Sequence, residues 1–129
     1  MILHVQVSPG ELIDKLTILE IKMEEIHDTK KLVNVERELT LLLDVMKKEL
    51  PPSEELTRLH TELRIINKKI WDTENDVREF WNDDAKFLAG ARGSHFYNDE
   101  RARVKREINQ LLGSTIIEEK SHPKYEHTA

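Results

Sequence analysis

The sequence predicts a mainly all-α fold, an antiparallel bundle of four helices. In three separate stretches of the chain, apolar residues recur at alternating spacings of four and three, which places them on one face of a helix. Short breaks at residues 28–29 and 51–52 separate these stretches, and helices joined by short connections pack antiparallel. At 129 residues the chain has the size of one domain with one core. We therefore expect a single helical-bundle domain over residues 1–129, with residues 122–129 as a frayed tail.

The first element is a short β-prone segment, residues 1–7, in which apolar residues alternate with polar ones. Residues 115–117, near the other end of the chain, are also β-prone. The two segments could pair as a short β-ladder beside the helices.

The first helix is expected from Pro9 to about His27. Ser8 can cap it, proline suits its first position, and Glu11 can close a capping box. Its main stripe does not account for every large aliphatic residue, because three isoleucines point away from it: Ile13, Ile18 and Ile21. A helix that is apolar on more than one side is either central or contacts another subunit.

The second helix is expected over about residues 30–49, because Pro51 forbids its continuation. Leu41 and Val45 lie off its main stripe and join the candidate interface residues.

The third helix is expected to start at Ser53, and its apolar stripe runs from Leu56 towards Trp81. Trp71 lies off this stripe and is therefore another candidate interface residue.

If the third helix continued to residue 89 it would be roughly 55 Å long, more than its partners could cover. We therefore expect a long third helix with a kink or break near residues 82–84. Two glycines and a serine then predict a loop over residues 90–97, followed by a fourth helix that begins at Asn98 or Asp99 and ends at Gly113.

This predicted loop and the start of the helix after it are the candidate anion-binding region. Free backbone N–H groups, a helix N-terminus and arginines can bind phosphate or carboxylate. The candidate residues are Arg92, His95, Tyr97 and Arg101. Neighbouring acidic residues and the different directions of the basic side chains count against one coherent basic surface.

Composition narrows the classes of function. The net charge of −5 and the lack of a one-sided basic helix argue against a nucleic-acid partner. These 129 residues contain no cysteine, which excludes thiolate chemistry and cysteine-ligated metal sites. We expect no metal ion and no cofactor, and no stretch has the roughly 20 apolar residues of a membrane span. A cytoplasmic location is the simplest interpretation.

Several stretches together resemble a known family. They are residues 8–22, 71–72 with 74–78, 98–102, 105–109, and 113–114 with 118–121, and they include SPGELIDKLTILEIK and KREIN. They are similar to a family of short bacterial and phage proteins described as a domain of unknown function. The resemblance covers about residues 1–121 and implies no activity, cofactor or catalytic residue.

Two hypotheses of function therefore stand. The first is a non-enzymatic interaction or assembly module that forms a homodimer or binds a protein partner through its excess apolar surface. The second is a small binding protein or enzyme for a phosphorylated or otherwise anionic ligand at residues 90–97 and the start of the fourth helix.

Overall fold

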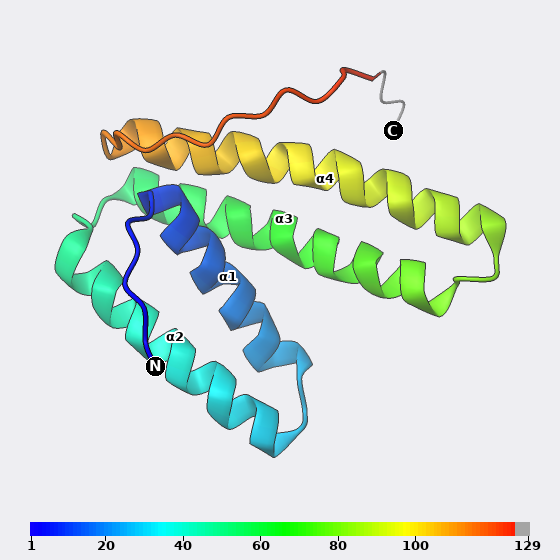
Figure 1. The fold of residues 1–129 in the computed structure, drawn as a ribbon, viewed down its shortest axis with the longest axis horizontal. Helices are drawn as coiled ribbons and strands as arrows, with labels where there is room; N and C mark the ends of the chain where they lie inside the picture. Colours follow the sequence, from blue (N-terminus) through cyan, green and yellow to red (C-terminus); the bar gives the residue numbers. More distant parts are fainter. Residues whose placement is uncertain (126–129) are drawn as a thin grey trace.

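The chain forms a bundle of four α-helices in the computed structural model, which describes residues 1–125. The helices are α1 (Pro9–Glu25), α2 (Thr29–Glu49), α3 (Glu54–Glu79) and α4 (Asp84–Leu111). Figure 1 shows α3 and α4 as a long antiparallel hairpin, with α1 inclined across it and α2 on the far side of α1. Helix α1 packs against the other three helices, so it is the central one. The all-α bundle is confirmed.

A polar side chain caps the start of each helix. Ser8 accepts from the backbone N–H of Glu11, Ser53 accepts from that of Leu56, and Asp28 and Asp83 cap α2 and α4 in the same way. At the other end of α4, Gly113 has a φ of +65°, the left-handed conformation that glycine adopts without strain. The predicted end of the last helix at Gly113 is confirmed.

The core lies where α1 crosses the α3–α4 hairpin. Helices α1, α3 and α4 supply its buried members, which are Leu12, Ile13, Leu16, Leu56, Leu59, Leu63, Ile66, Val104 and Ile108. Helix α2 contributes partly buried leucines and a methionine from one side. The stripe predicted for the third helix is buried only in part, because Trp81 lies beyond the end of α3 and is 66% exposed.

The predicted interruption near residues 82–84 is a complete reversal of the chain. Helix α3 ends at Glu79, and α4 starts at Asp84 and runs back along α3 (Figure 1). The predicted loop over residues 90–97 and the helix start at Asn98 or Asp99 are wrong, since both lie inside α4. The glycines there serve close packing: a Cβ at Gly90 would lie 3.4 Å from the Thr73 carbonyl oxygen, and one at Gly93 would lie 3.2 Å from Thr73 Cγ2.

The two β-prone segments do not pair, because residues 1–125 contain no strand. Ion pairs hold the C-terminal segment along α4 instead, where Glu118 binds Lys105 at 3.1 Å and Glu119 binds Arg106 at 3.2 Å. Figure 1 shows this segment following α4 while the N-terminal segment runs towards α2. Of the predicted frayed tail, residues 126–129 lie outside the described part of the chain.

Candidate functional site

A buried ion pair joins α1 to α4. The Asp14 side chain is 1% exposed, and it accepts hydrogen bonds from Arg101 Nε at 2.8 Å and Arg101 Nη2 at 2.5 Å. This two-point contact is the strong geometry for a guanidinium and a carboxylate. It fixes the direction of Arg101 and leaves the outer edge of its guanidinium towards solvent.

Asn67 connects α3 to the same pair. Its Nδ2 donates to Asp14 Oδ1 at 3.0 Å and to Thr17 Oγ1 at 2.8 Å, and the Thr17 hydroxyl donates to the carbonyl of Asp14 at 2.7 Å. The carboxylate can only accept, so these bonds determine which end of the Asn67 amide faces α1. The amide oxygen therefore points away from α1.

The electrostatics of this network favour its charged form. Burial raises the pKa of the Asp14 carboxyl, but hydrogen bonds from Arg101 and Asn67 and the charges of Arg101 and Lys105 outweigh burial, so the pKa lies below its ordinary value. The hydrogen bond to Asp14 raises the pKa of Arg101 in turn. Both groups are ionised throughout the physiological pH range.

A second buried contact joins the start of α1 to α4. The backbone N–H of Gly10 donates to Asn109 Oδ1 at 2.7 Å, and Lys105 Nζ lies 2.8 Å from Glu11 Oε2. A Cβ at Gly10 would lie 2.5 Å from the Lys105 carbonyl oxygen. Only glycine allows the two helices this close.

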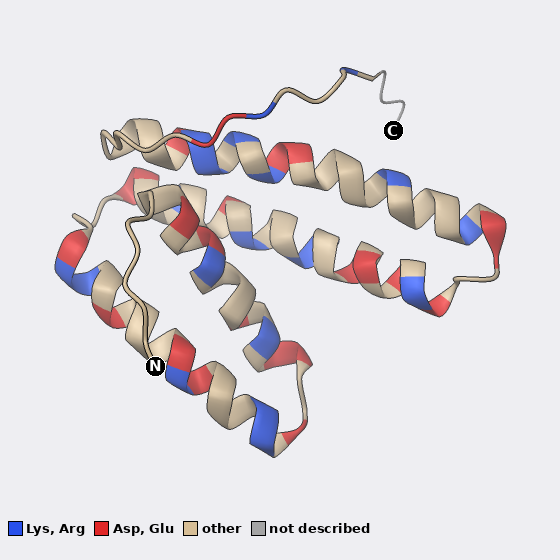
Figure 2. Ribbon diagram, in the orientation of Figure 1, with Lys and Arg blue, Asp and Glu red and all other residues tan. Residues whose placement is uncertain are grey.

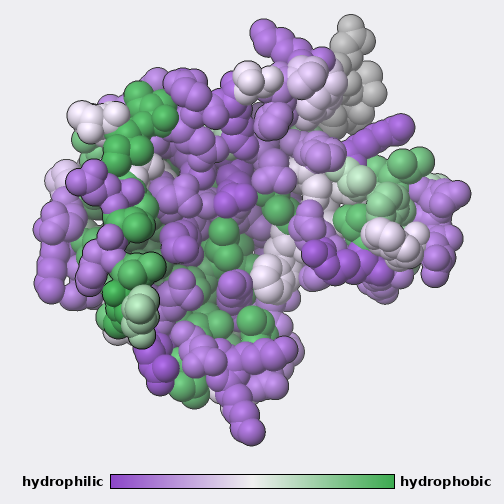
Figure 3. All heavy atoms as spheres, viewed as in Figure 1, coloured by the Kyte–Doolittle hydropathy of each residue, from purple (hydrophilic) through white to green (hydrophobic). Residues whose placement is uncertain are grey.

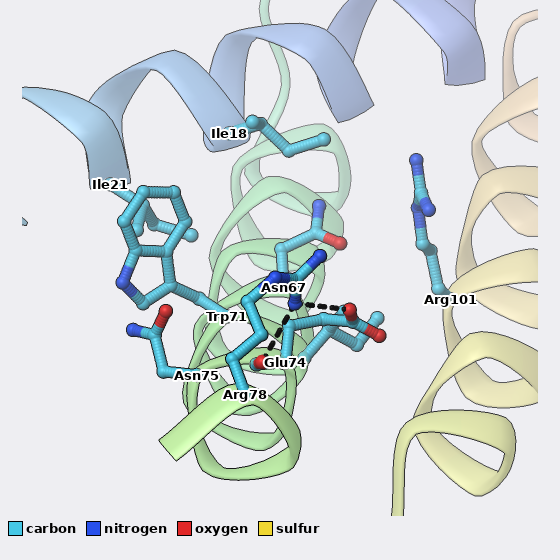
Figure 4. Close-up of a pocket in the computed structure, with 9 residues that line it drawn as sticks. Ile18, Ile21, Asn67, Trp71, Glu74, Asn75, Arg78 and Arg101 are labelled. Carbon is cyan, nitrogen blue, oxygen red and sulfur yellow. Dashed lines mark hydrogen bonds and ion pairs between the residues drawn. The ribbon is translucent and has the colours of Figure 1, made fainter. Parts of the chain in front are cut away.

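A pocket of about 300 Å³ opens beside the Asp14–Arg101 pair, between α1, α3 and α4. We call it the central pocket. Figure 4 shows its labelled walls: Ile18 and Ile21 come from α1, Arg101 comes from α4, and the other labelled residues come from α3. The lining residues are Ile18, Ile21, Asn67, Ile70, Trp71, Glu74, Asn75, Arg78 and Arg101.

The rim of the central pocket carries a second ion pair. Arg78 Nη1 donates to Glu74 Oε2 at 2.8 Å, and the Ser94 hydroxyl donates to Glu74 Oε1 at 2.9 Å. The hydrogen bond from Arg78 contributes most and that from Ser94 contributes next, and together they lower the pKa of the Glu74 carboxyl. Figure 4 shows the Arg78 side chain reaching along α3 towards Asn67 with Glu74 beside it. The pocket thus presents charges of both signs.

The structure brings together four of the predicted site residues that belonged to different hypotheses. Ile18, Ile21 and Trp71, predicted for an interface, line the central pocket with Arg101, predicted for an anion site. Ile13 and Ile21 are buried against the other helices of the same chain, so they offer no exposed face to a partner. Their off-stripe positions arise because α1 is central.

The predicted anion site is not assembled as a cluster. Arg92 and Arg101 are nine residues apart in one helix, about two and a half turns, so they lie on opposite sides of α4. The backbone N–H groups of residues 90–97 are used within the helix, and His95 is exposed while Tyr97 packs against the core. Figure 2 shows acidic and basic residues interspersed along the helices rather than gathered into a basic face.

Leu41 and Val45 lie on the outer side of α2. Both are exposed, and so is Val33, which lies eight residues, about two turns, before Leu41. The three residues are separated by multiples of four and therefore fall on one row of the helix. We call Val33, Leu41 and Val45 the α2 row. Unlike Ile13 and Ile21, these residues remain available to a partner.

Several important residues were missed from the sequence. Asp14, Asn67 and Glu74 were not among the candidates, although Asp14 shares a face of the first helix with Ile18 and Ile21, at i+4 and i+7, which is unusual for an acid. That signal could have identified Asp14. Its partners come from 53 and 87 residues away, and no local pattern names them.

Within residues 1–125, no three or more His, Asp or Glu side chains lie where they could hold a metal ion together, and no helix there could span a membrane. No curated protein and no solved structure matches the chain. The model of a family of unknown function, DUF6165, matches residues 3–128, so the chain belongs to this family.

Proposed function

We propose that this domain is an assembly module that binds a second copy of itself through its N-terminal segment, residues 1–7, and the α2 row. The observation that carries the proposal is the exposure of the N-terminal segment, in which Leu3 and Val5 are each 76% exposed. Figure 3 shows hydrophobic atoms gathered over this segment at the left of the view. Aliphatic side chains left this far in water favour association.

The backbone of the segment supports pairing with another strand. Residues 1–7 have no regular secondary structure, run as an open trace in Figure 1, and form no hydrogen bond to any other described residue. A row of unpaired N–H and C=O groups is a template for a β-strand from another chain. Pairing would satisfy these groups and order the segment.

The side chains have the alternation that a strand with one apolar face requires. Leu3, Val5 and Val7 project to one side, and Ile2, His4 and Gln6 project to the other. In an antiparallel pair of two identical segments with His4 at the twofold axis, each Leu3 would lie opposite the partner's Val5. Cross-strand aliphatic pairs of this kind stabilise a strand pair.

Two features favour a second copy of the chain as the occupant of this surface. Residues 1–125 contain no strand with which the segment could pair inside its own chain. A twofold axis lets the same segment serve as donor and acceptor, as closed homodimers do. Since an isolated pair of strands is marginally stable, the α2 row is needed as additional apolar surface. Together the two surfaces could bury on the order of 800 Å² per chain, the size of a specific interface.

Sedimentation velocity from 1 to 200 µM protein tests this proposal. We expect a monomer–dimer equilibrium for the full chain, and at least a tenfold weaker dimer for Val5→Pro, because proline removes a backbone donor. Leu41→Lys should weaken the dimer similarly by placing a charge in the α2 row. Ile117→Pro and Thr40→Lys are the matched controls, since both positions are exposed and lie outside the proposed interface.

Circular dichroism would establish that each variant keeps the helical content of the parent chain. A parent chain that stays monomeric at 200 µM would overturn the proposal. So would a folded Val5→Pro variant that dimerises as tightly as the parent, because the N-terminal segment would then have no part in the contact.

A further inference from the structure

The central pocket contains an acceptor that the protein itself does not use. The Asn67 side chain is 4% exposed, and both of its N–H bonds are donated to Asp14 and Thr17. Among the described residues, no group donates to Asn67 Oδ1. Within residues 1–125 no fully buried side-chain oxygen lacks a partner, so this oxygen reaches the surface of the pocket that Asn67 lines. A buried amide with a free oxygen directed into a pocket points to a ligand that donates a hydrogen bond.

Arg101 supplies donors beside this oxygen. A guanidinium has five N–H bonds, of which two are donated to Asp14 and one, at 3.4 Å, to Asn98. Two N–H bonds therefore remain for another partner. Figure 4 shows the Asn67 oxygen on the side of the amide that faces Arg101.

Glu74 and Arg78 repeat this pairing of acceptor and donor at the rim. Each has partners already, yet both are partly exposed and can accept or donate further hydrogen bonds. A simple anion such as phosphate would meet two arginines but also a carboxylate and an amide oxygen, which repel it. A simple cation would meet the carboxylate and the amide oxygen but also the two arginines, which repel it. The polar end of the pocket is suited to a ligand that carries both charges.

The other end of the central pocket is apolar. Figure 4 shows the Trp71 indole beside Ile21, with Ile18 above the polar groups. An indole face and two isoleucines would cover an aliphatic or aromatic group of a ligand. The volume, about 300 Å³, lies at the lower end of the range for small-molecule pockets.

We infer that the central pocket binds a free α-amino acid with an apolar or aromatic side chain. Its ammonium group donates to Asn67 Oδ1 and Glu74, and its carboxylate accepts from Arg101 and Arg78. Its side chain packs against Trp71 and Ile18. This site shares no residue with the proposed dimer contact, so either proposal can fail without the other.

The test uses the Trp71 indole N–H as a probe in the Trp81→Phe variant, which leaves one tryptophan in the chain. In two-dimensional ¹H–¹⁵N spectra, L-phenylalanine should shift the Trp71 resonance saturably. 3-Phenylpropionate lacks the ammonium group and phenethylamine lacks the carboxylate, and each should bind at least tenfold more weakly. Glycine, which lacks the side chain, should leave the indole resonance unshifted.

Variants separate the polar contacts from the fold. In the same background, Glu74→Gln should weaken L-phenylalanine at least fivefold by removing the charge opposite the ammonium group, while Arg92→Gln, on α4 outside the pocket, should leave the affinity unchanged. No saturable shift up to 20 mM L-phenylalanine would overturn the inference. Equal affinity for phenylpropionate would do the same by showing a plain carboxylate site, and equal affinity for phenethylamine would show a cation site.

Discussion

At the scale of single residues, Asp14 shows how this bundle keeps a charge inside its core. Removing a carboxylate from water is costly unless a counter-charge and hydrogen bonds replace the water. Arg101 supplies the counter-charge at two points, and Asn67 supplies a further hydrogen bond. One side chain thereby fixes the positions of α1, α3 and α4 relative to one another.

Replacement of Asp14 by asparagine should lower the free energy of unfolding by roughly 2 kcal/mol at pH 7, since Arg101 then loses its counter-charge. The pKa of Asp14 is lowered in the folded state, so the ionised carboxylate stabilises the fold above its unfolded pKa, about 3.9. This contribution is lost as the pH falls through the folded pKa. The difference between parent and Asp14→Asn should be complete above about pH 5 and should narrow below pH 4.

Urea unfolding followed by circular dichroism between pH 2.5 and 7 measures this difference. Asp72→Asn is the control, because Asp72 is exposed and its ion pair with Lys68 lies on the surface, and it should change stability by at most about 0.5 kcal/mol. A difference between parent and Asp14→Asn that stays constant down to pH 2.5 would show that the carboxylate charge does not stabilise the fold.

The residue scale is also where prediction from sequence was weakest. Arg101 was predicted as an anion-binding residue, but its partner Asp14 was not among the candidates, because the two are 87 positions apart. The prediction that Ile13 and Ile21 form surplus apolar surface assumes that other helices cover only one side of α1. Both residues are buried, because α1 is covered on several sides. Spacing along a helix shows which side chains share a face, but it does not show how many faces other helices cover.

At the scale of the elements, sequence predicted the starts of the first three helices well because caps and prolines act locally. Ser8 and Ser53 cap the helices that they were expected to cap, and Pro51 follows the end of α2. The fourth helix was misplaced because Gly90 and Gly93 usually indicate a loop. Here their small size lets α4 approach α3, a reason that appears only once the two helices are side by side.

The closest approach of two helices, at Gly10, gives a prediction for packing. A Cβ in Gly10→Ala would lie 2.5 Å from a backbone oxygen and 2.9 Å from Asn109 Oδ1, the acceptor of the Gly10 N–H. The backbone of α4 cannot yield as a flexible side chain would, so we expect a loss of roughly 2 kcal/mol or more in the free energy of unfolding. Gly90→Ala, whose nearest contact is 3.4 Å, is the matched control and should change stability by less than about 1 kcal/mol.

Thermal and urea unfolding of both variants test this difference. A Gly10→Ala protein as stable as the parent would mean that α1 and α4 can separate at little cost, and the tight contact at Gly10 would then have no part in fixing the bundle.

At the scale of the whole molecule, the chain combines a well-packed centre with an unpacked edge. Helices α1, α3 and α4 enclose the core and the central pocket, whereas α2 and the N-terminal segment leave aliphatic side chains in water. Sequence predicted the all-α class and the break between the last two helices, since both follow from periodicity and length. It could not predict which apolar residues stay exposed, because that depends on the packing of all four helices together.

The contrast between centre and edge is the basis for the proposed assembly through residues 1–7. Hydrogen exchange of the backbone amides of these residues, measured at 1 and 200 µM protein, tests it most directly, because strand pairing protects amides that are otherwise open to water. We predict exchange at the rate of an unstructured peptide at 1 µM and clear protection at 200 µM, with no protection at either concentration in Val5→Pro. Unprotected exchange at both concentrations in the parent chain would contradict the proposal.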